Sequence, residues 1–209
     1  MTAIGLDVAQ GGDDYTVAAP RRGGWCAPLV RKVGKETRLG SDVAAKVVRI
    51  RDNNCPVIVD VGGGWGADAI GALERNGIAA TSFKGQLPSA AMTREGGLRF
   101  YNKRAEAWWR FREELNPDQP FGSSIALPPD ASIKADLAAP RWELTPRGIK
   151  IEDKAEIRKR LGRSPDDGDA IVMCLSEGAK AAMKQARARN WQNRPTRANV
   201  GYAEFKARS

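Results

Sequence analysis

The stretch AIGLDVA at residues 3–9 is a short apolar run that a single acid interrupts. In two later stretches an acid also borders an apolar run: VIVD at residues 57–60 and SPDDGDAIV at residues 164–172, which carries three acids. We expect the first two to be buried strands, and the third to begin a helix, because Ser and Pro favour the first helical positions. Each stretch carries one candidate acid at its border: Asp7, Asp60 and Asp169.

Composition narrows the chemistry that these acids can perform. The chain of 209 residues contains no histidine, so a site built from the three acids offers only oxygen ligands. Such a site suits Mg²⁺ or Mn²⁺ and not zinc. The net charge of +9 indicates a polyanionic partner such as nucleic acid. Together these features predict metal-dependent cleavage of nucleic acid.

The hydrophobic pattern along the chain changes character near residue 40. Before it, strands are separated by glycine-rich turns, which predicts an antiparallel meander. After it, helices and strands alternate, which favours parallel strands. The expected strands are residues 3–9, 15–19, 25–33, 56–61, 78–83, 141–144 and 149–151. The expected helices are residues 41–51, 67–76, 102–115, 133–138, 153–161 and 164–189.

This order is typical of the α/β ribonuclease H-like fold of the RuvC and integrase type. We expect a mixed sheet of five or more strands, with an antiparallel meander followed by parallel strands, flanked by helices. Residues 1–189 would form this one domain. In the fold the first strand is central and the fourth pairs with it in parallel, so Asp7 and Asp60 would lie side by side. Asp169 would reach the same place from the last helix.

Hydrolysis of a phosphodiester needs an activated water and a stabilised leaving oxygen. Two divalent ions can serve both ends of such a displacement. We assign the position between two Mg²⁺ or Mn²⁺ ions to Asp7, and one ion each to Asp60 and Asp169. Asp13, in a glycine-rich turn, is a secondary candidate for the second ion.

The third ligand is open at this point. Asp166 and Asp167 stand within one helical turn of Asp169, and Asp166 is a secondary metal candidate. Acids in the first turn of a helix also stabilise its dipole, and an Asp before glycines, such as Asp60, also forms turns. Each acid therefore has a structural interpretation beside the catalytic one.

Basic residues suggest where DNA would lie. Lys154 and Arg158 are four residues apart on one expected helix, and Arg160 continues the charge. Lys84 follows a strand and is a further candidate for a phosphate contact. Residues 179–209 carry eight Lys or Arg against one Glu, and we predict that residues 190–209 form a flexible basic tail.

Other classes of protein are disfavoured. The three cysteines are widely spaced and form no CxxC pair, which disfavours disulfides and zinc sites, and Cys55 and Cys174 adjoin apolar residues as buried thiols in a reducing compartment would. The sequence has no run of 18 apolar residues, so we expect no membrane span, and we find no secretory signal at the N-terminus.

At these motifs the chain resembles the nuclease domain of the large terminase subunit of tailed double-stranded DNA bacteriophages. The first two matching stretches are residues 5–16, GLDVAQGGDDYT, and residues 57–60 with the glycines that follow. The third and most specific is residues 154–171, KAEIRKRLGRSPDDGDAI. The connecting YNKRAEAWW at residues 101–109 is also similar to that family. The resemblance covers about residues 3–185.

The resemblance implies an Mg²⁺- or Mn²⁺-dependent endonuclease that cuts concatemeric double-stranded viral DNA during genome packaging. By motif, its metal acids would be Asp7, Asp60 and Asp169. Its partners would be the packaging ATPase domain, the small terminase subunit and the portal, in the cytoplasm of the host bacterium. The chain has no Gly-x-x-x-x-Gly-Lys-Ser/Thr phosphate loop, so we predict no translocation activity and interpret it as an isolated nuclease domain.

Three alternatives remain open. The DVGGG stretch at residues 60–64 is similar to a phosphate-binding turn of actin-like nucleotide-binding modules, although those need two such domains. A catalytically silent DNA-binding domain would depend on its basic tail and not on Asp7. A Holliday-junction resolvase of the same fold would prefer branched DNA.

Overall fold

The computed structural model describes residues 1–9, 11–62 and 64–192. Its strands are β1 (Ala3–Asp7), β2 (Tyr15–Arg22), β3 (Trp25–Cys26), β4 (Val30–Val33), β5 (Val57–Asp60), β6 (Ala80–Phe83), β7 (Trp142–Thr145) and β8 (Gly148–Ile151). Its helices are η1 (Gly34–Glu36, 3-10), α1 (Gly40–Ile50), α2 (Gly66–Arg75), α3 (Lys103–Leu115), α4 (Ala131–Ala138), α5 (Lys154–Leu161) and α6 (Asp166–Gln192).

Within these described ranges the main sheet has six strands and β1 lies at its centre. Neighbouring strands follow the order β3-β2-β1-β5-β6, and β4 also pairs with β2. β2 runs antiparallel to β1, whereas β5 is parallel to β1 and β6 is parallel to β5. The predicted mixed sheet, an antiparallel meander followed by parallel strands, is confirmed.

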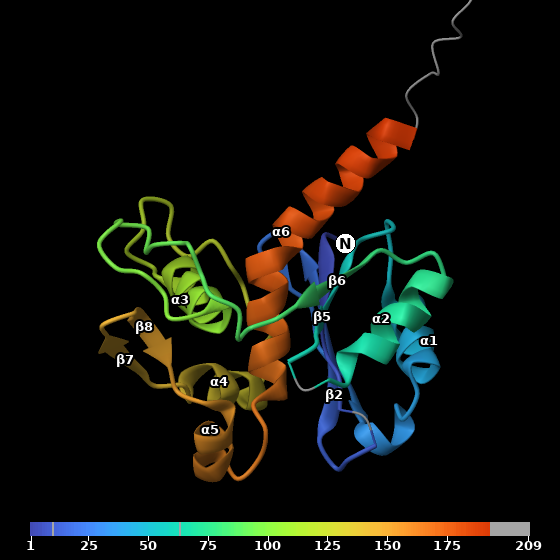
Figure 1. Cartoon of the computed structure of the whole chain (residues 1–209), viewed down its shortest axis with the longest axis horizontal. Helices are drawn as coiled ribbons and strands as arrows, with labels where there is room; N and C mark the ends of the chain where they lie inside the picture. The colour runs from blue at the N-terminus through green and yellow to red at the C-terminus, as the bar shows by residue number, and fades with distance from the viewer. Residues whose placement is uncertain (10, 63, 193–209) are drawn as a thin grey trace, which may run out of the picture.

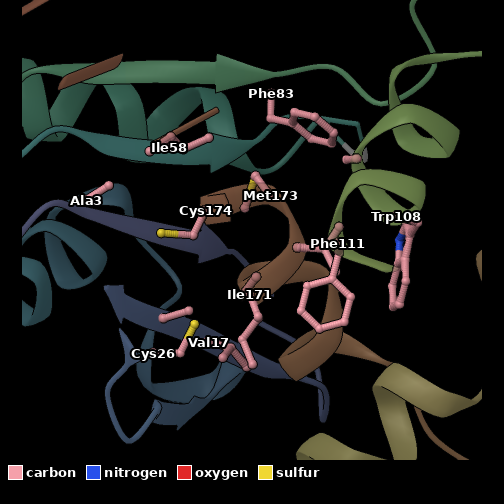
Figure 2. Close-up of a cluster of buried hydrophobic side chains, with 14 of the residues drawn as sticks. Ala3, Val17, Cys26, Ile58, Phe83, Trp108, Phe111, Ile171, Met173 and Cys174 are labelled. Atoms are coloured by element: carbon pink, nitrogen blue, oxygen red, sulfur yellow. The ribbon is translucent and has the colours of Figure 1, made fainter. Parts of the chain in front are cut away.

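Helices cover both faces of this sheet, with α1 and α2 on one face and α6 on the other (Figure 1). Successive side chains of a strand point to opposite faces, so a strand covered on both is apolar throughout. In β1, Ile4 and Leu6 join the cluster beneath α1 and α2, whereas Ala3 joins the one beneath α6. Figure 2 shows Ala3 and Ile58 facing Cys174 of α6.

Gly5 sets the distance between β1 and α6. A Cβ atom at this position would lie 2.1 Å from the carbonyl oxygen of Ala170, which is a clash with helix backbone. Glycine therefore allows the first turns of α6 to lie directly on the central strand. The apolar residues that follow in α6, among them Ile171 and Cys174, are buried against the sheet.

A second group of elements lies on the other side of α6 from the sheet (Figure 1). It consists of α3, α4, α5 and the antiparallel hairpin of β7 and β8. Trp108 and Phe111 of α3 pack towards α6, while Trp109 packs with Phe100 and Ile149. Both adjacent tryptophans, Trp108 and Trp109, are therefore core residues. The two groups of elements enclose a cleft beside the beginning of α6.

Several sequence-based boundaries differ from the structure, and β2, for example, continues to Arg22 beyond the expected residues 15–19. Residues 25–33 were expected to form one strand, but they form β3 and β4, which pair with different parts of β2. Pro28 explains the interruption, because it has no N–H for the strand ladder. The last helix continues to Gln192 instead of ending near Arg189. Most of the expected basic tail, residues 193–209, lies outside the described residues.

The three cysteines are buried and free, which confirms the predicted burial of Cys55 and Cys174. Among the described residues, no helix combines the length and the apolar character that crossing a bilayer requires.

Candidate active site

The ends of β1 and β5 place two acids next to each other. Leu6 is in parallel register with Val59, so the following residues, Asp7 and Asp60, lie at the same edge of the sheet. Asp7 is buried and Asp60 is partly buried. The backbone N–H of Gly62 donates a hydrogen bond of 2.8 Å to Oδ1 of Asp60, which holds this carboxylate at the end of its strand.

The beginning of α6 supplies two further acids. Asp166 and Asp169 line the same cleft as Asp7 and Asp60. The indole N–H of Trp108 donates to Oδ1 of Asp169 over 3.3 Å, and the hydroxyl of Ser164 is hydrogen bonded to Asp166. The four carboxylates therefore come from three separate elements, and neighbouring polar groups orient three of them.

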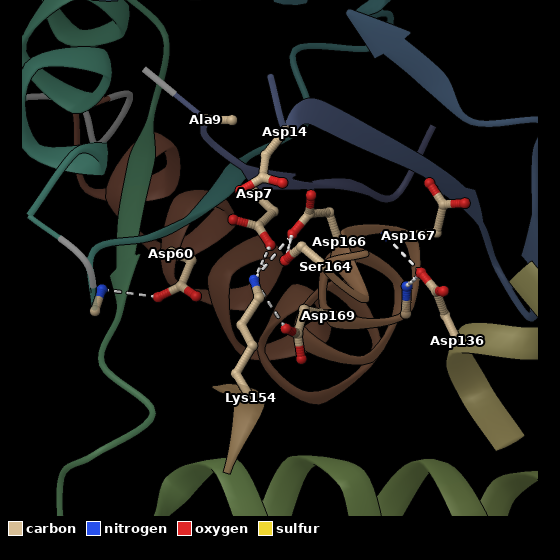
Figure 3. Close-up of polar contacts among 12 residues, drawn as sticks. Asp7, Ala9, Asp14, Asp60, Asp136, Lys154, Ser164, Asp166, Asp167 and Asp169 are labelled. Carbon is tan, nitrogen blue, oxygen red and sulfur yellow. Dashed lines mark hydrogen bonds and ion pairs between the residues drawn. The ribbon is translucent and has the colours of Figure 1, made fainter. Parts of the chain in front are cut away.

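The ammonium group of Lys154 lies among these acids (Figure 3). Its Nζ atom is 2.9 Å from Oδ2 of Asp7, 3.0 Å from Oδ1 of Asp166 and 3.1 Å from Oδ2 of Asp169. Lys154 was predicted to be part of a DNA-facing stripe on α5. In the structure its charge is directed into the acidic cluster.

The electrostatics of the cluster favour additional positive charge. Burial raises the pKa of Asp7 to about 7, and the negative charges of Asp166, Asp169 and Asp60 add to this despite the opposing effect of Lys154. Burial also raises the pKa of Asp60. For Lys154, burial lowers the pKa, but the three acids in contact with it outweigh burial and hold its pKa above the usual value.

The donor chemistry fits a hard divalent cation. Among the described residues, no three His, Cys, Asp or Glu side chains stand close enough together to ligate one ion, and the Lys154 ammonium lies between the acids. An ammonium and a metal ion are attracted by the same carboxylate oxygens. The Lys154 ammonium therefore marks a place where three carboxylates stabilise positive charge, and carboxylates are the ligands that Mg²⁺ prefers.

Asp167 points away from the cleft, although it lies between Asp166 and Asp169 in sequence. Its carboxylate accepts hydrogen bonds of 2.8 Å from Arg31 of β4 and 2.9 Å from the Ser132 hydroxyl. Asp136 of α4 is buried close by, and its Oδ2 accepts from the backbone N–H groups of Asp167 and Gly168. These contacts fix the first turn of α6, and with it the direction of Asp166 and Asp169.

Of the two neighbouring acids Asp13 and Asp14, the structure brings Asp14 to the cleft and not Asp13, the secondary metal candidate. Asp13 is exposed and pairs with Lys35 at 2.6 Å, which lowers its pKa, and it does not line the cleft of the four acids. Asp14 does line the cleft, and both of its oxygens accept hydrogen bonds from Arg158, at 3.0 and 3.2 Å. The signal for this was available, because Asp14 directly precedes the strand that pairs with Asp7.

Of the other residues predicted to contact DNA, some line the cleft and some lie outside it. Arg158 lines the cleft, whereas Lys84 and Arg160 do not. Arg160 donates to both carboxylate oxygens of Glu152 at 2.7 Å and lowers the pKa of that acid to about 2. Lys84 is exposed just after β6.

The cleft has a volume of about 890 Å³ and contains residues that the sequence did not single out. Arg104 of α3 donates to the Glu152 carbonyl over 2.8 Å, and its guanidinium is 3.7 Å from Oδ1 of Asp169. Arg104 and Trp108 are four residues apart and therefore share one face of α3. That spacing, inside the stretch at residues 101–109, was the available signal.

A sheet centred on β1, with acids at the ends of β1 and β5 and on α6, defines a ribonuclease H-like fold with an acidic cleft. Comparison with known proteins shows which proteins share this fold. No protein-family model and no curated protein matches the chain. Among solved structures, the nuclease domain of the large terminase subunit gp2 of bacterial virus Sf6 has a TM-score of 0.65 at 19% identity, covering 83% of this chain and 86% of that one.

Two further solved structures agree with this similarity. A mutant of the Sf6 domain with manganese and β-thujaplicinol has a TM-score of 0.64 at 19% identity, covering 83% of this chain and 86% of that one. The large terminase nuclease of thermophilic phage G20c with bound magnesium has a TM-score of 0.55 at 21% identity, covering 84% and 80%. The chain thus has the ribonuclease H-like fold of large terminase nuclease domains.

Proposed function

We propose that this chain is a divalent-metal-dependent endonuclease that cuts double-stranded DNA by hydrolysing phosphodiester bonds. The observation that carries the proposal is the convergence of Asp7, Asp60, Asp166 and Asp169 on one cleft, around the ammonium of Lys154. These acids are far apart in the sequence, and the tertiary fold brings them to the same cleft. The metal-bound terminase nucleases of similar fold support the same activity.

The four acids are the residues that would hold the metal. Asp7 comes from the central strand and contacts the same ammonium as Asp166 and Asp169, and it would be one of the residues that hold the Mg²⁺ or Mn²⁺ ions. Asp60 and Asp169 would complete the two ligand sets, with Asp166 beside them. Two such ions supply an activated water and stabilise the leaving oxygen.

The remaining cleft residues would bind and orient. Without metal, Lys154 holds the carboxylates of Asp7, Asp166 and Asp169 together, and it would turn its ammonium towards a DNA phosphate when metal binds. Arg158 and Lys150 line the cleft and would bind the phosphates on either side of the cut. The indole N–H of Trp108 holds one oxygen of Asp169 and so fixes the direction of the other.

The biological setting follows from the kind of protein that shares this fold. The proposed substrate is concatemeric viral DNA, cut at the beginning and end of genome packaging. The proposed partners are a packaging ATPase domain, a small terminase subunit and a portal. The proposed location is the cytoplasm of an infected bacterium.

Plasmid cleavage tests the activity directly. The wild-type protein is expected to nick or linearise supercoiled plasmid with Mg²⁺ or Mn²⁺ and to be inactive with EDTA. Asp7→Ala and Asp60→Ala are expected to lower the rate by at least about 100-fold, because each removes an essential group of one catalytic unit.

Asp118→Ala is the matched control, since Asp118 is an exposed acid in the loop after α3 and does not line the cleft. It is expected to cut like the wild type. A wild-type protein that leaves plasmid intact with both ions would contradict the proposal, as would Asp7→Ala cutting at the wild-type rate. Preference for a four-way junction over linear duplex would instead identify a resolvase.

A further inference from the structure

Trp65 places a large aromatic side chain in the wall of the acidic cleft. Its side chain is 56% exposed. Several large apolar side chains are exposed among the described residues, and Trp65 is the one of them that lines this cleft. Isolated exposed apolar residues are common on protein surfaces. An exposed indole beside four carboxylates is a different case, because it faces the place where a substrate would lie.

The backbone fixes Trp65 relative to Asp60. After β5 the chain turns sharply: the N–H of Gly64 donates to the Val61 carbonyl over 3.2 Å, and Gly64 has a φ of +86°. Trp65 follows and α2 begins at Gly66. A Cβ on Gly66 would lie 2.1 Å from the carbonyl oxygen of Asp60, so this turn is packed directly against the strand end that carries the acid.

We propose that Trp65 is a wedge residue, whose indole inserts at the DNA step being cut and partly unstacks it. The inference rests on the proposed endonuclease function and deepens it by naming a substrate preference. Apolar side chains that insert between base pairs kink the duplex, and base–aromatic stacking compensates for the lost stacking. The protein would therefore favour steps that unstack easily, such as pyrimidine–purine steps and mismatches.

The surroundings of Trp65 favour nucleic acid over protein as the group it contacts. Protein-binding surfaces usually present a contiguous apolar patch with few charges at its centre. Here the same cleft is lined by Arg158, Lys150 and Arg104 together with the acids. Trp65 is the exposed one of the aromatic residues in this lining, and an exposed aromatic group among cations matches a stacked base between phosphates.

Trp142 is a matched control for Trp65. It is 51% exposed, a fraction similar to that of Trp65, and it belongs to β7. Its ring packs edge-on against Trp109 with the ring centroids 5.1 Å apart. Trp142 does not line the acidic cleft, so replacing it removes an exposed tryptophan without changing the cleft wall.

The test compares two short duplexes of the same sequence, one fully paired and one with a single mismatch, cut with Mn²⁺ present. We expect Trp65→Ala to lower the rate on the paired duplex by about tenfold, consistent with the loss of one stacking contact. Cleavage at the mismatch should change less than about twofold, because that step is already unstacked. Trp65→Phe should recover much of the rate, and Trp142→Ala should behave like the wild type.

Two results would overturn the wedge while the endonuclease stands. In one, Trp65→Ala cuts both duplexes at the wild-type rate, which would show that the indole does not act on DNA and would favour a role in binding a protein. In the other, it loses both activities equally, which would indicate a structural role. A wild-type protein that cuts neither duplex overturns the endonuclease itself, so the two failures are distinguishable.

Discussion

Lys154 is the residue on which the metal-free cleft depends. Its ammonium contacts Asp7, Asp166 and Asp169, and these four groups are mostly withdrawn from water. Without a cation, the carboxylates would face one another at short range, and like charges in a poorly solvated site repel strongly. Lys154 thus does for the metal-free protein what a metal ion would do for the active one.

Replacing Lys154 by Ala is therefore expected to destabilise the metal-free protein and to strengthen its response to metal. We expect a loss of about 1–2 kcal/mol, below that of a fully buried pair because the lysine side chain is 38% exposed. In EDTA the melting temperature should fall by roughly 2–8 °C. Titrated Mg²⁺ should then raise it by more than in the wild type, since no ammonium competes for the acids.

Lys150→Ala is the control for that measurement. Lys150 also lines the cleft, but its ion pair is with Glu143 at 3.3 Å and not with the candidate metal acids. Its melting temperature in EDTA should remain close to that of the wild type. Equal melting temperatures for Lys154→Ala and the wild type in EDTA would show that the ammonium does not hold the cluster together.

At the scale of the elements, the site depends on how closely α6 approaches β1. Gly5 permits that approach, because any side chain there would meet the Ala170 carbonyl. Asp169 immediately precedes Ala170, and Asp7 lies two residues beyond Gly5. The same contact therefore determines both the packing of the helix and the distance between acids from two elements.

Gly5→Ala is expected to weaken both the fold and the site. Overpacking a core contact with helix backbone costs about 1–3 kcal/mol, and α6 would have to move away from the sheet. The melting temperature should fall, and metal-dependent cleavage should fall further than the loss of folded protein explains. Gly97→Ala is the control, because a Cβ there meets nothing within 4 Å. Gly5→Ala with unchanged cleavage would contradict this account of the contact.

The elements were more predictable than the site. Apolar runs and turn residues located β1, β5 and α6 and their order, because local periodicity carries that information. Local periodicity does not show in which direction each side chain points. Lys154 and Arg160 belong to one basic run, yet the tertiary fold directs one into the acids and the other to Glu152.

The acids show the same limit. The sequence favoured Asp169 as the third metal ligand, but Asp166 and Asp167 within the same helical turn left that choice open. Contacts with Arg31 and Asp136, both distant in the chain, now distinguish them. Trp65 was not distinguished from other tryptophans, because only the folded cleft brings it beside the acids.

For the molecule as a whole, charge is distributed unevenly. The chain carries +9 overall, but six aspartates line its central cleft, among them the four candidate metal acids. Long-range attraction to a polyanion and local attraction to divalent cations are therefore separate properties of one molecule. Because the cleft acids include buried carboxylates, the stability of the protein also depends on pH.

The raised pKa of Asp7 determines whether the folding stability rises or falls with pH. Its folded pKa is about 7, above the ordinary value of 3.8, so its ionised form is disfavoured in the folded state. The stability it contributes is fully present below pH 3.8 and is lost as the pH rises through about 7. Asp60, whose pKa burial also raises, acts in the same direction. The chain has no histidine, and burial raises the pKa of Cys26 to about 11 and of Cys174 to about 12, so few other groups titrate in this window.

The metal-free protein is thus expected to lose roughly 2–3 kcal/mol of stability between about pH 5 and about pH 8, from the proton bound by folded Asp7. Melting temperatures in EDTA measure this, and Mg²⁺ should reverse the loss at the higher pH, because it binds the ionised acids. Asp7→Asn removes the titrating group, keeps nearly the same shape, and should flatten the profile. If Asp7→Asn loses as much stability as the wild type over this range, another group is responsible and the assignment to Asp7 fails.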